Sequence, residues 1–362
     1  MDTAHTPPSG SADHGAAHDR ETVEIVLPGK VEPDGLQITR RPLPPPEEGR
    51  AVLRVEATGV SFAEQQMRRG KYFDQPPFPF VPGYDLIGTV TEVGPGVSPE
   101  TVGRRYAAVT KTGAWAGRVA VPAGDLVPVP DGVDPAEAET LVVNGLTAWQ
   151  MLHRVARVRR GATVLVHGAN GGVGSTLAQL ARHAGIRVVG TASPRHHDAV
   201  RALGAIPLDY RAGDLAAQVR ALAPAGVAAV FDHVGGPGIT DSFRVLARGG
   251  TLVSYGTAST RDVAGSSHLP VLRLLLRLAV WRVLPNGRRT HFYNLWAGRR
   301  NARRFRARMR RDLGTVFGLL ADGGLRAQVA ARLPLTEAGA AMALAESGTV
   351  IGKVVLVGSE EG

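Results

Sequence analysis

ATVLVHGANGGVGSTLAQLARHAG (162–185) is the stretch of this 362-residue chain that decides its fold. The apolar run at 162–168 has the composition of a buried strand, and it leads directly into a glycine-rich turn and then a helical pattern. Against the pattern G-x-G-x-x-G, Ala169 stands at the first glycine, while Gly171 and Gly174 fill the other two places. Small residues there let the backbone turn sharply and approach the pyrophosphate of a dinucleotide, which lies at the helix N-terminus. The stretch therefore predicts a dinucleotide-binding turn.

The alternation of strand and helix continues after this turn. Four further strand candidates, separated by helical stretches, lie at 186–192, 205–209, 227–236 and 250–256. Strands that alternate with helices build right-handed β-α-β units and a parallel sheet. We therefore predict an α/β fold in which residues 141–295 form a Rossmann-type, doubly wound, dinucleotide-binding domain.

The flanking sequence has a different pattern. Short strands broken by Gly and Pro predict a mainly antiparallel, barrel-like domain over residues 21–140. The strand candidates there are 51–60, 86–94 and 117–123, and the other expected elements are helices at about 135–157, 299–322 and 336–346 and a closing strand at 351–358. We expect the closing strand to pair back into the first domain, which would then be discontinuous (21–140 and 296–362). Residues 1–20 are rich in Pro, Gly, Ser, Ala and charge, which predicts disorder.

The composition excludes several classes of chemistry. The sequence has no cysteine, which excludes disulfides, thiolate catalysis and cysteine-based zinc sites. Its histidines show no metal-binding spacing, so we expect no bound metal. The net charge is +10, but only four of the 42 basic residues are lysine, a bias typical of coding composition. No aromatic pattern for base stacking accompanies the charge, so no nucleic-acid partner is expected. With neither a signal-peptide pattern nor a spanning apolar run, we expect a cytoplasmic protein.

The residues after the second strand select the form of the dinucleotide. A site that prefers NAD usually carries an Asp or Glu about 20 residues after the glycine turn, to bond the ribose hydroxyls. No acid stands there in this chain; Ser193, Arg195 and His196 follow the strand, and Tyr210 follows the next one. Charge-assisted hydrogen bonds contribute about 1.5–3 kcal/mol each. Two of them to a 2′-phosphate would favour NADPH over NADH by roughly 10²–10⁴-fold. We predict NADPH as cofactor; the alternative is that Arg195 is a solvated residue at a helix start.

Several motifs together resemble those of one family. From about residue 23 to the end, the chain is similar to the medium-chain dehydrogenase/reductase superfamily, and within it to the zinc-independent quinone oxidoreductase and VAT-1-like branch. The matching stretches are ATGVSFAEQQMRRGKY (57–72), PFVPGYDLIGTVTEVGPGV (79–97), NGLTAWQML (144–152), VLVHGANGGVG (164–174) and IGKVVLVG (351–358). The resemblance implies that the antiparallel domain is GroES-like and that the protein is a homodimer.

The same motifs depart from those of zinc-containing relatives. Those relatives have a cysteine ligand where this chain has Ser61, and His-Glu where it has Tyr84-Asp85, and they carry a four-cysteine lobe that is missing here. Alcohol dehydrogenation by the zinc route is therefore not expected. A quinone or an α,β-unsaturated carbonyl compound suits such a site better, because the charge of the accepted hydride spreads to an oxygen that hydrogen bonds can stabilise.

The resemblance also implies roles for single residues. Tyr72 matches the proposed proton donor of 2-enoyl thioester reductases, with a packed loop aromatic as the alternative. Ser61 stands where quinone reductases usually have Asn, and would donate a hydrogen bond with shorter reach. Asn144 and Thr147 match positions that line the nicotinamide pocket, with helix capping and local backbone bonding as the alternative. From its position just after a strand end, His233 is expected to be a structural histidine with satisfied hydrogen bonds; the alternative is that it lines the cofactor cleft. The candidate cofactor-binding residues are Asn144, Thr147, Ala169, Asn170, Gly171, Gly172, Val173, Gly174, Ser193, Arg195, His196, Tyr210 and Gly256.

An Arg- and Leu-rich segment, LPVLRLLLRLAVWRVL (269–284), lies in a predicted helical insert at 267–285. Arg273, Arg277 and Arg282 recur at four- and five-residue spacing, which places them roughly on one helical face and leaves an apolar face that contains Trp281. Three arginines make a membrane-spanning helix implausible. The helix is expected to pack at a subunit interface or cover the substrate cleft; the alternative is reversible attachment to a membrane surface.

Three functions are consistent with these observations. The leading hypothesis is an NADPH-dependent oxidoreductase that transfers hydride to quinones or α,β-unsaturated carbonyl compounds. The second is a 2-enoyl thioester reductase. The third, from another class, is a nucleotide-binding protein for membrane or partner interaction with little catalysis.

Overall fold

The structure is a computed structural model that describes residues 20–72, 74–261 and 268–358. The tail that the sequence predicts to be disordered, residues 1–20, lies outside this range except for Arg20. The strands are β1 (Glu21–Val26), β2 (Gln37–Pro42), β3 (Arg50–Val60), β4 (Asp85–Val93), β5 (Arg105–Val109), β6 (Arg118–Pro122), β7 (Val127–Pro128), β8 (Thr163–His167), β9 (Arg187–Thr191), β10 (Ala205–Leu208), β11 (Val227–Asp232), β12 (Leu246–Ser254), β13 (Arg289–Phe292), β14 (Val329–Pro334) and β15 (Lys353–Val357). The α-helices are α1 (Phe62–Arg68), α2 (Pro135–Leu141), α3 (Val143–Trp149), α4 (Gly172–His183), α5 (His197–Ala202), α6 (Leu215–Leu222), α7 (Ile239–Arg244), α8 (His268–Val283), α9 (Ala302–Ala321) and α10 (Ala338–Glu346).

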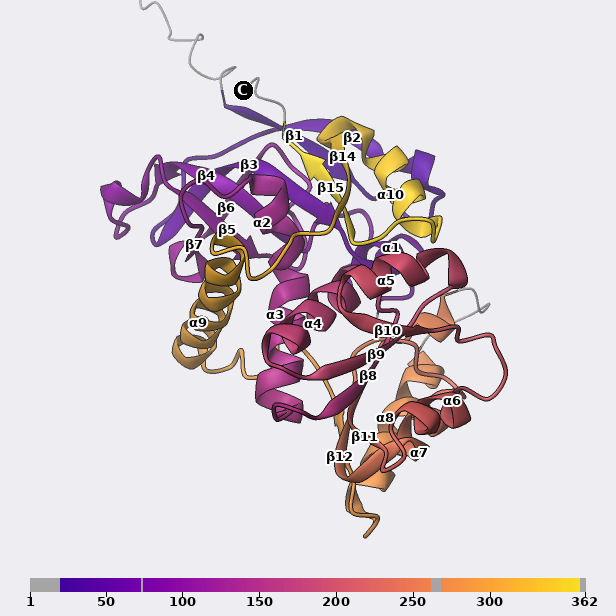
Figure 1. The fold of residues 1–362 in the computed structure, drawn as a ribbon. Coiled ribbons are helices and arrows are strands. Elements are labelled where there is room, and N and C mark those ends of the chain that lie inside the picture. The colour runs from indigo at the N-terminus through magenta and orange to yellow at the C-terminus, as the bar shows by residue number, and fades with distance from the viewer. Residues whose placement is uncertain (1–19, 73, 262–267, 359–362) are drawn as a thin grey trace, which may run out of the picture.

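The second half of the chain forms a parallel sheet. Its strands run in the order β10-β9-β8-β11-β12-β13, and every neighbouring pair is parallel. Counted along the chain this is the order 3-2-1-4-5-6 of a dinucleotide-binding sheet. Helices cover both faces, since α4 and α5 pack in one hydrophobic cluster and α6, α7 and α8 pack in another (Figure 1). The predicted Rossmann-type sheet is therefore present.

The order of the strands places the site. Chain order reverses between β8 and β11, and open α/β sheets bind ligands outside the carboxyl ends of the strands at such a switch point. The glycine turn follows β8 and His233 follows β11, so both lie at this point.

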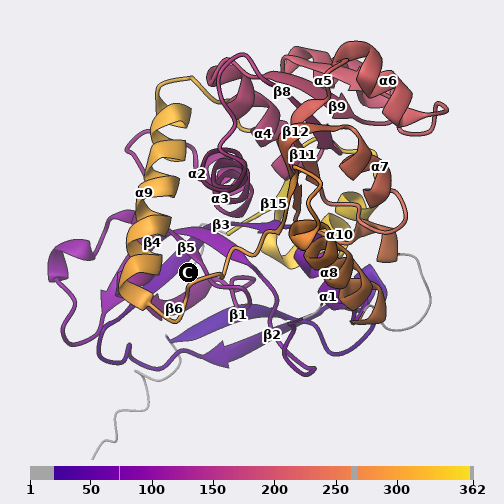
Figure 2. The same ribbon diagram turned by 90° about the horizontal axis from the view of Figure 1, so that it is seen from below.

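The first part of the chain forms a mainly antiparallel sheet in the order β14-β15-β3-β4-β5-β7, with β6 paired to β3, and β1 and β2 pair beside it (Figure 2). The C-terminal strand β15 pairs antiparallel with β3, in the register Val354–Val60. This pairing confirms the prediction that the closing strand returns to the first domain. The chain thus combines an α/β domain with a GroES-like antiparallel domain.

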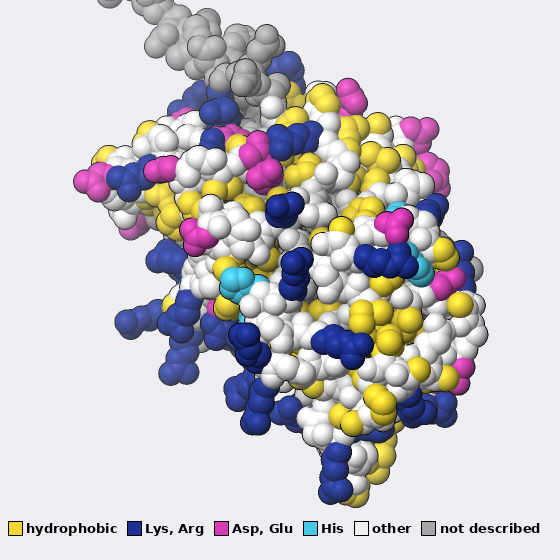
Figure 3. Space-filling view, viewed as in Figure 1, with side chains coloured by type: hydrophobic (Ala, Val, Ile, Leu, Met, Phe, Trp, Pro, Cys, Tyr) yellow, Lys and Arg dark blue, Asp and Glu magenta, His cyan; other side chains and the backbone are white. Residues whose placement is uncertain are grey.

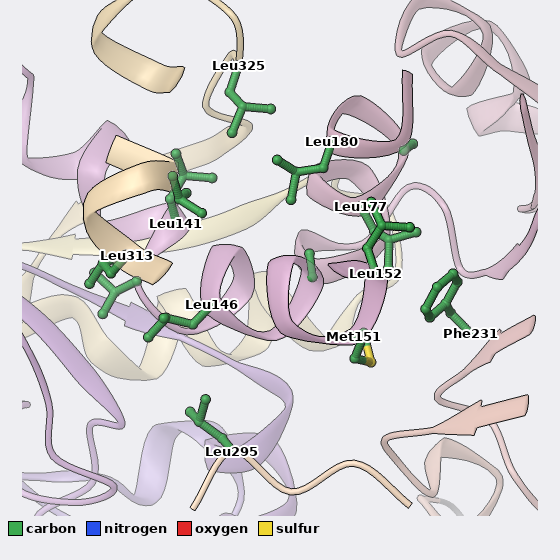
Figure 4. Close-up of a cluster of buried hydrophobic side chains, with 14 of the residues drawn as sticks. Leu141, Leu146, Met151, Leu152, Leu177, Leu180, Phe231, Leu295, Leu313 and Leu325 are labelled. Carbon is green, nitrogen blue, oxygen red and sulfur yellow. The ribbon is translucent and has the colours of Figure 1, made fainter. Parts of the chain in front are cut away.

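One hydrophobic cluster joins the two sheets. It contains Ile87 from β4, Leu146 from α3, Leu177 from α4 and Phe231 from β11. Figure 4 shows α3 at the centre of this cluster, between side chains from both parts of the molecule. Because α3 carries Asn144 and Thr147, this packing fixes two predicted site residues against the Rossmann sheet.

The Arg-rich helix predicted near 299–322 is present as α9. Its apolar side packs through Phe305, Met309 and Leu313, and Arg303 and Arg311 are exposed. Figure 3 shows Lys and Arg side chains gathered on the α9 side of the molecule. In the part of the chain that is described, no helix has the length and apolar character needed to cross a membrane.

Two predictions about local structure were wrong. The strand predicted at 227–236 ends at Asp232, because the carboxylate Oδ1 of that residue accepts the backbone N–H groups of Val234 and Gly235 (both 2.8 Å) and turns the chain. In α8, Arg282 does not share a face with Arg273, because nine residues turn a helix by about half a turn. The Trp281 ring stacks on Phe243 of α7 at 4.3 Å, so the apolar face that contains Trp281 packs inward.

Candidate functional site

The glycine turn between β8 and α4 has the geometry of a pyrophosphate cradle. A Cβ on Gly174 would collide with the carbonyl oxygen of Gly168, and one on Gly172 would collide with the side-chain amide of Asn144. At Gly171, the N-cap of α4, a Cβ would meet only the Gly168 oxygen, at 3.4 Å. The first N–H groups of a helix have no intrahelical acceptor. They therefore face the open space beside Gly171, where an anionic group would be stabilised.

The turn also explains why alanine stands at the first glycine position. The positive φ of 64° belongs to the preceding residue, Gly168. Ala169 is fully buried, donates its N–H to the Thr191 carbonyl (2.9 Å) and lies against Gly190, where a Cβ would approach it to 2.6 Å. Conformational freedom is thus needed at Gly168, while position 169 needs only a small side chain.

The C-terminal segment ties this turn to the antiparallel domain. The carbonyl of Asn170 accepts the N–H of Gly352 (3.0 Å), and Gly171 and Gly352 form an isolated bridge. Val173 follows within the first turn of α4. The candidate cofactor site therefore includes a contact between the two sheets.

Asn144 and Thr147 lie one turn apart on α3, and both are buried. The Asn144 amide packs against Gly172 at the start of α4. Neither side chain caps a helix, since the N-cap of α3 is Val142. The structure thus places Asn144 beside the glycine turn, and the prediction that Asn144 and Thr147 line a nicotinamide pocket stays a prediction.

The residues predicted to bind a 2′-phosphate follow two paired strands. β9 pairs with β10 in the register Thr191–Leu208, so Ser193 and Tyr210 follow strand ends that adjoin. Arg195 and Tyr210 are exposed, while His196 is buried. The Arg195 guanidinium donates to the Gly348 carbonyl (3.0 Å), and His196 Nε2 lies 3.2 Å from the same oxygen. Arg195 is therefore partly engaged with the loop after α10.

On the substrate side, Tyr72 is the end of a hydrogen-bonded chain of aromatic side chains. Its hydroxyl lies 3.0 Å from that of Tyr84, and the Trp296 indole N–H donates to the Tyr84 oxygen at 2.6 Å. An indole N–H only donates. Either hydroxyl of the Tyr72–Tyr84 pair can be the donor. When Tyr84 donates to Tyr72, the Tyr72 proton is left for an acceptor outside the chain. Burial, with the neighbouring Tyr84, raises the pKa of Tyr72 far above its ordinary value, so it stays protonated.

Ser61 has a structural partner within its own helix. It is the N-cap of α1: its Oγ accepts the Ala63 N–H (3.1 Å) and bonds the Glu64 carboxylate, which also accepts the Ser61 N–H (2.9 Å). Glu64 is fully buried, and burial raises its pKa. Its other oxygen accepts the Tyr84 N–H (2.7 Å). Ser61 thus supports the backbone that holds Tyr84, and a direct catalytic role for it stays a prediction.

His233 differs from the expectation of a satisfied structural histidine. Its ring lies directly over Gly168, where a Cβ would come within 2.5 Å of Cε1, and its Nδ1 has no hydrogen-bond partner among the residues described. Burial lowers its pKa, so the ring is neutral. Gly256, after β12, is the glycine that lets this backbone approach, since a Cβ there would meet the His233 carbonyl at 2.8 Å. His233 therefore offers a free nitrogen at the cofactor edge of the sheet.

Sequence reasoning also missed the buried charges beneath the site. Lys353 Nζ lies 2.9 and 3.0 Å from the two carboxylate oxygens of Asp85 and 2.6 Å from Glu139 Oε1, and all three side chains are buried. Asp85 also accepts the Val143 N–H at the start of α3 (3.0 Å). Burial raises the pKa of Glu139, and its Oε2 has no partner within the described chain.

The residues of a metal site are not assembled in the described part of the chain. No three side chains among its His, Asp and Glu residues are grouped to hold an ion. At the position that matches a zinc ligand of relatives, the Tyr84 side chain instead joins the aromatic chain.

Family models and a solved structure match these features. Residues 47–131 match the alcohol dehydrogenase GroES-like domain, and residues 203–356 match the zinc-binding dehydrogenase model. A mycobacterial protein solved in complex with NADPH is 30% identical, with a TM-score of 0.78 over 93% of this chain and 99% of that one. The chain belongs to the medium-chain dehydrogenase/reductase superfamily.

Within the superfamily, the chain falls in the quinone oxidoreductase and VAT-1-like branch. A mycobacterial quinone oxidoreductase is 31% identical, with a TM-score of 0.76 over 93% of this chain and 99% of that one. The synaptic vesicle membrane protein VAT-1 homolog of Rattus norvegicus is 36% identical over 239 residues, which are 65% of this chain and 59% of that relative. A mycocerosic acid synthase-like polyketide synthase of Mycobacterium tuberculosis is 30% identical over 95% of this chain, which corresponds to 16% of that protein.

Proposed function

We propose that this member of the superfamily is an NADPH-dependent reductase that transfers hydride to quinones or α,β-unsaturated carbonyl compounds. The observation that carries the proposal is the hydrogen-bonded chain Trp296–Tyr84–Tyr72, which ends in a hydroxyl whose pKa is raised by burial. Such a donor stabilises an oxygen on which negative charge develops. NADPH, which the cradle at Gly171 and Gly172 fits, would supply the hydride.

The protein's own groups would bind and orient the reactants. The free N–H groups at the start of α4 would hold the pyrophosphate, and Asn144 would fix the start of that helix. His233 Nδ1, which has no partner among the described residues, would offer a further polar contact beside the turn. Tyr72 would donate to the substrate oxygen, and the buried aromatic chain behind it would exclude water from the donor.

The test of this function is a panel of quinones, enones and enoyl thioesters, each assayed with NADPH and NADH. Oxidation of NADPH by quinones or enones is the expected result. No turnover with any acceptor would instead favour a nucleotide-binding protein with little catalysis. Homodimer formation, which the resemblance implies, is a separate prediction that light scattering would check.

Arg195 is proposed to select NADPH. Replacing Arg195 by glutamine is expected to raise the Kd for NADPH about tenfold, because a charge-assisted hydrogen bond to the 2′-phosphate is lost. The effect is limited to about tenfold because, in binding the phosphate, Arg195 gives up its hydrogen bond to the Gly348 carbonyl. The Kd for NADH should hardly change. Fluorescence titration with both cofactors measures the difference. Arg201→Gln is the matched control, since Arg201 is a nearby exposed arginine paired to Asp198. Equal turnover of the wild type with both cofactors would contradict the assignment of Ser193 and Arg195.

Tyr72→Phe is expected to separate two substrate classes. It removes the end donor of the chain and should slow enoyl-thioester reduction about 10²-fold, because that reaction needs directed protonation. Quinone reduction should fall by less than about tenfold. Steady-state rates of NADPH oxidation with both acceptors measure the effect. Tyr106→Phe is the control, since Tyr106 lies on β5 and its hydroxyl belongs to no hydrogen bond in the described structure. Unchanged rates with every acceptor would remove Tyr72 from the site.

A second candidate function is 2-enoyl thioester reduction. The match to a mycocerosic acid synthase-like polyketide synthase over 95% of this chain supports it. If an enoyl thioester is turned over faster than any quinone, and Tyr72→Phe abolishes that activity, this candidate replaces the first.

A further inference from the structure

Helix α8 carries an exposed apolar surface. Among the described residues, eleven large apolar side chains are exposed, and seven of them lie in 269–284. They are Leu269, Leu272, Leu275, Leu276, Val280, Val283 and Leu284. Leu272 is 62% exposed, Leu276 63% and Val283 81%, so water covers most of each. We call this set the α8 stripe.

The α8 stripe lies opposite the face by which the helix packs. Val271, Leu274 and Leu278 follow the i, i+3, i+7 spacing of one face, and all three are buried. Leu274 and Leu278 belong to the cluster shared with α6 and α7. Leu272 and Leu276 lie roughly half a turn away on the helix, at about 100° per residue. Figures 1 and 2 both place α8 at the surface of the α/β domain, beside α7. The helix is thus apolar on two opposite sides, and its core packing needs only one.

Arginines border the stripe, and no acid balances them. Arg273 and Arg277 lie along one border and Arg282 along the other, and residues 268–292 include no Asp or Glu. None of these three guanidinium groups makes an ion pair within the described structure, although Arg277 contacts Thr240 (3.5 Å) and the Trp281 ring. The surface therefore combines exposed leucine and valine with unbalanced positive charge.

We propose that the α8 stripe docks the protein reversibly on a membrane surface that contains anionic lipids. A helix of this kind lies in the plane of the headgroups, with its apolar face at the acyl boundary. Long arginine side chains reach from such a position to the lipid phosphates. The proposal does not depend on the reductase activity.

Charge favours this occupant over a second copy of the chain. A twofold contact through the stripe would bring each helix's arginines toward those of its partner, with no carboxylate on either α8 to separate them. An anionic bilayer offers the apolar and the negative components together, and attraction to it grows with each basic residue near the surface. Docking on a membrane and pairing with a second copy of the chain predict different results in the experiments below.

Sedimentation with vesicles tests the proposal. The full-length protein is mixed with vesicles of phosphatidylcholine containing phosphatidylserine, or of phosphatidylcholine alone. It should sediment with the first and stay in solution with the second, and raised salt should weaken the binding because it screens charge. If the protein binds neither kind of vesicle at low salt, the proposal is wrong.

Paired variants separate the stripe from general surface charge. Leu272→Glu with Leu276→Glu should lower the vesicle-bound fraction at least about tenfold and leave thermal unfolding unchanged, since both side chains are already in water. The control, Ile38→Glu with Val102→Glu, makes the same change in charge at exposed apolar residues elsewhere. Arg273→Gln with Arg282→Gln should weaken binding to the anionic vesicles by about tenfold. Its control, Arg303→Gln with Arg311→Gln, removes the same charge from α9. An equal loss in variants and controls would contradict a specific surface.

Light scattering of the same variants tests whether the α8 stripe binds a second copy of the chain. The wild type and Leu272→Glu with Leu276→Glu should have the same molar mass in solution. If the substitution instead converts a dimer to monomers, the stripe is a subunit interface and the membrane proposal is overturned. NADPH oxidation in solution serves as a further check, because it should be the same in all of these proteins.

Discussion

Replacing Gly171 by aspartate is expected to raise the Kd for NADPH by about 10²–10³-fold without destabilising the protein. The φ of −77° and ψ of 169° at this N-cap suit any residue, and a Cβ meets only the Gly168 oxygen at 3.4 Å. An N-cap aspartate accepts the first N–H groups of the helix. These are the donors that the proposed pyrophosphate needs. Its charge would repel the phosphates as well, at about 4 kcal/mol for charges about 4 Å apart at an effective dielectric constant of about 20. Titration calorimetry with NADPH measures the change.

Gly171→Asn is the matched control for the charge. Asparagine has the same shape and also caps helices, so its thermal unfolding midpoint should match that of the aspartate variant or nearly so. Its Kd for NADPH should rise only about tenfold, because it competes for the N–H groups but adds no negative charge. An equal rise in the Kd for NADPH in both variants would show that the shape of the new side chain, and not its charge, weakens binding. If neither variant weakens binding, the turn does not hold the pyrophosphate.

The Rossmann sheet could be predicted because its signals are local. A buried strand, a turn of small residues and a helix lie within 162–185, and the strand order follows from alternation and handedness. Alanine in place of the first glycine, at position 169, is compatible with the predicted turn because the neighbouring Gly168 supplies the positive φ. The return of β15 to β3 was predictable as a closing strand, although its register needed the structure.

The aromatic chain could not be predicted from the sequence. Tyr84 and Trp296 are 212 residues apart, and no local pattern connects them. The one available signal was that Tyr84 occupies the place of a zinc ligand in relatives. The free Nδ1 of His233 also depends on distant packing against Gly168 and Gly256.

The orientation of α8 shows another limit of periodicity. Spacing tells which side chains share a face, but α8 is apolar on two faces, so spacing alone could not say which one packs. The Trp281 ring of α8 stacks on the Phe243 ring of α7, and these two helices meet only in the folded domain. This contact shows which face of α8 packs against the protein. The assignment of Arg282 to the same face as Arg273 failed for a simpler reason, since nine residues turn a helix by about half a turn.

The buried charges around Lys353 lead to the second large effect. Lys353→Met is expected to lower the free energy of unfolding by about 3–5 kcal/mol, because it leaves the Asp85 and Glu139 carboxylates buried without a cation. Both are fully buried, and Lys353 is 3% exposed. Methionine keeps most of the volume of lysine in a place where the Cε packs closely on Gly59. Urea unfolding followed by circular dichroism measures the loss.

An exposed ion pair supplies the control for this substitution. Lys111→Met breaks the bond to Asp74, whose side chain is 69% exposed, and should cost no more than about 1 kcal/mol because water solvates the carboxylate that remains. Adding Asp85→Asn and Glu139→Gln to Lys353→Met should recover at least half of the lost stability, since the uncompensated charges are then gone. If Lys353→Met costs no more than Lys111→Met, the Lys353 ammonium does not stabilise the two buried carboxylates. If the triple variant is less stable than Lys353→Met, the loss comes from packing around Gly59 and not from charge.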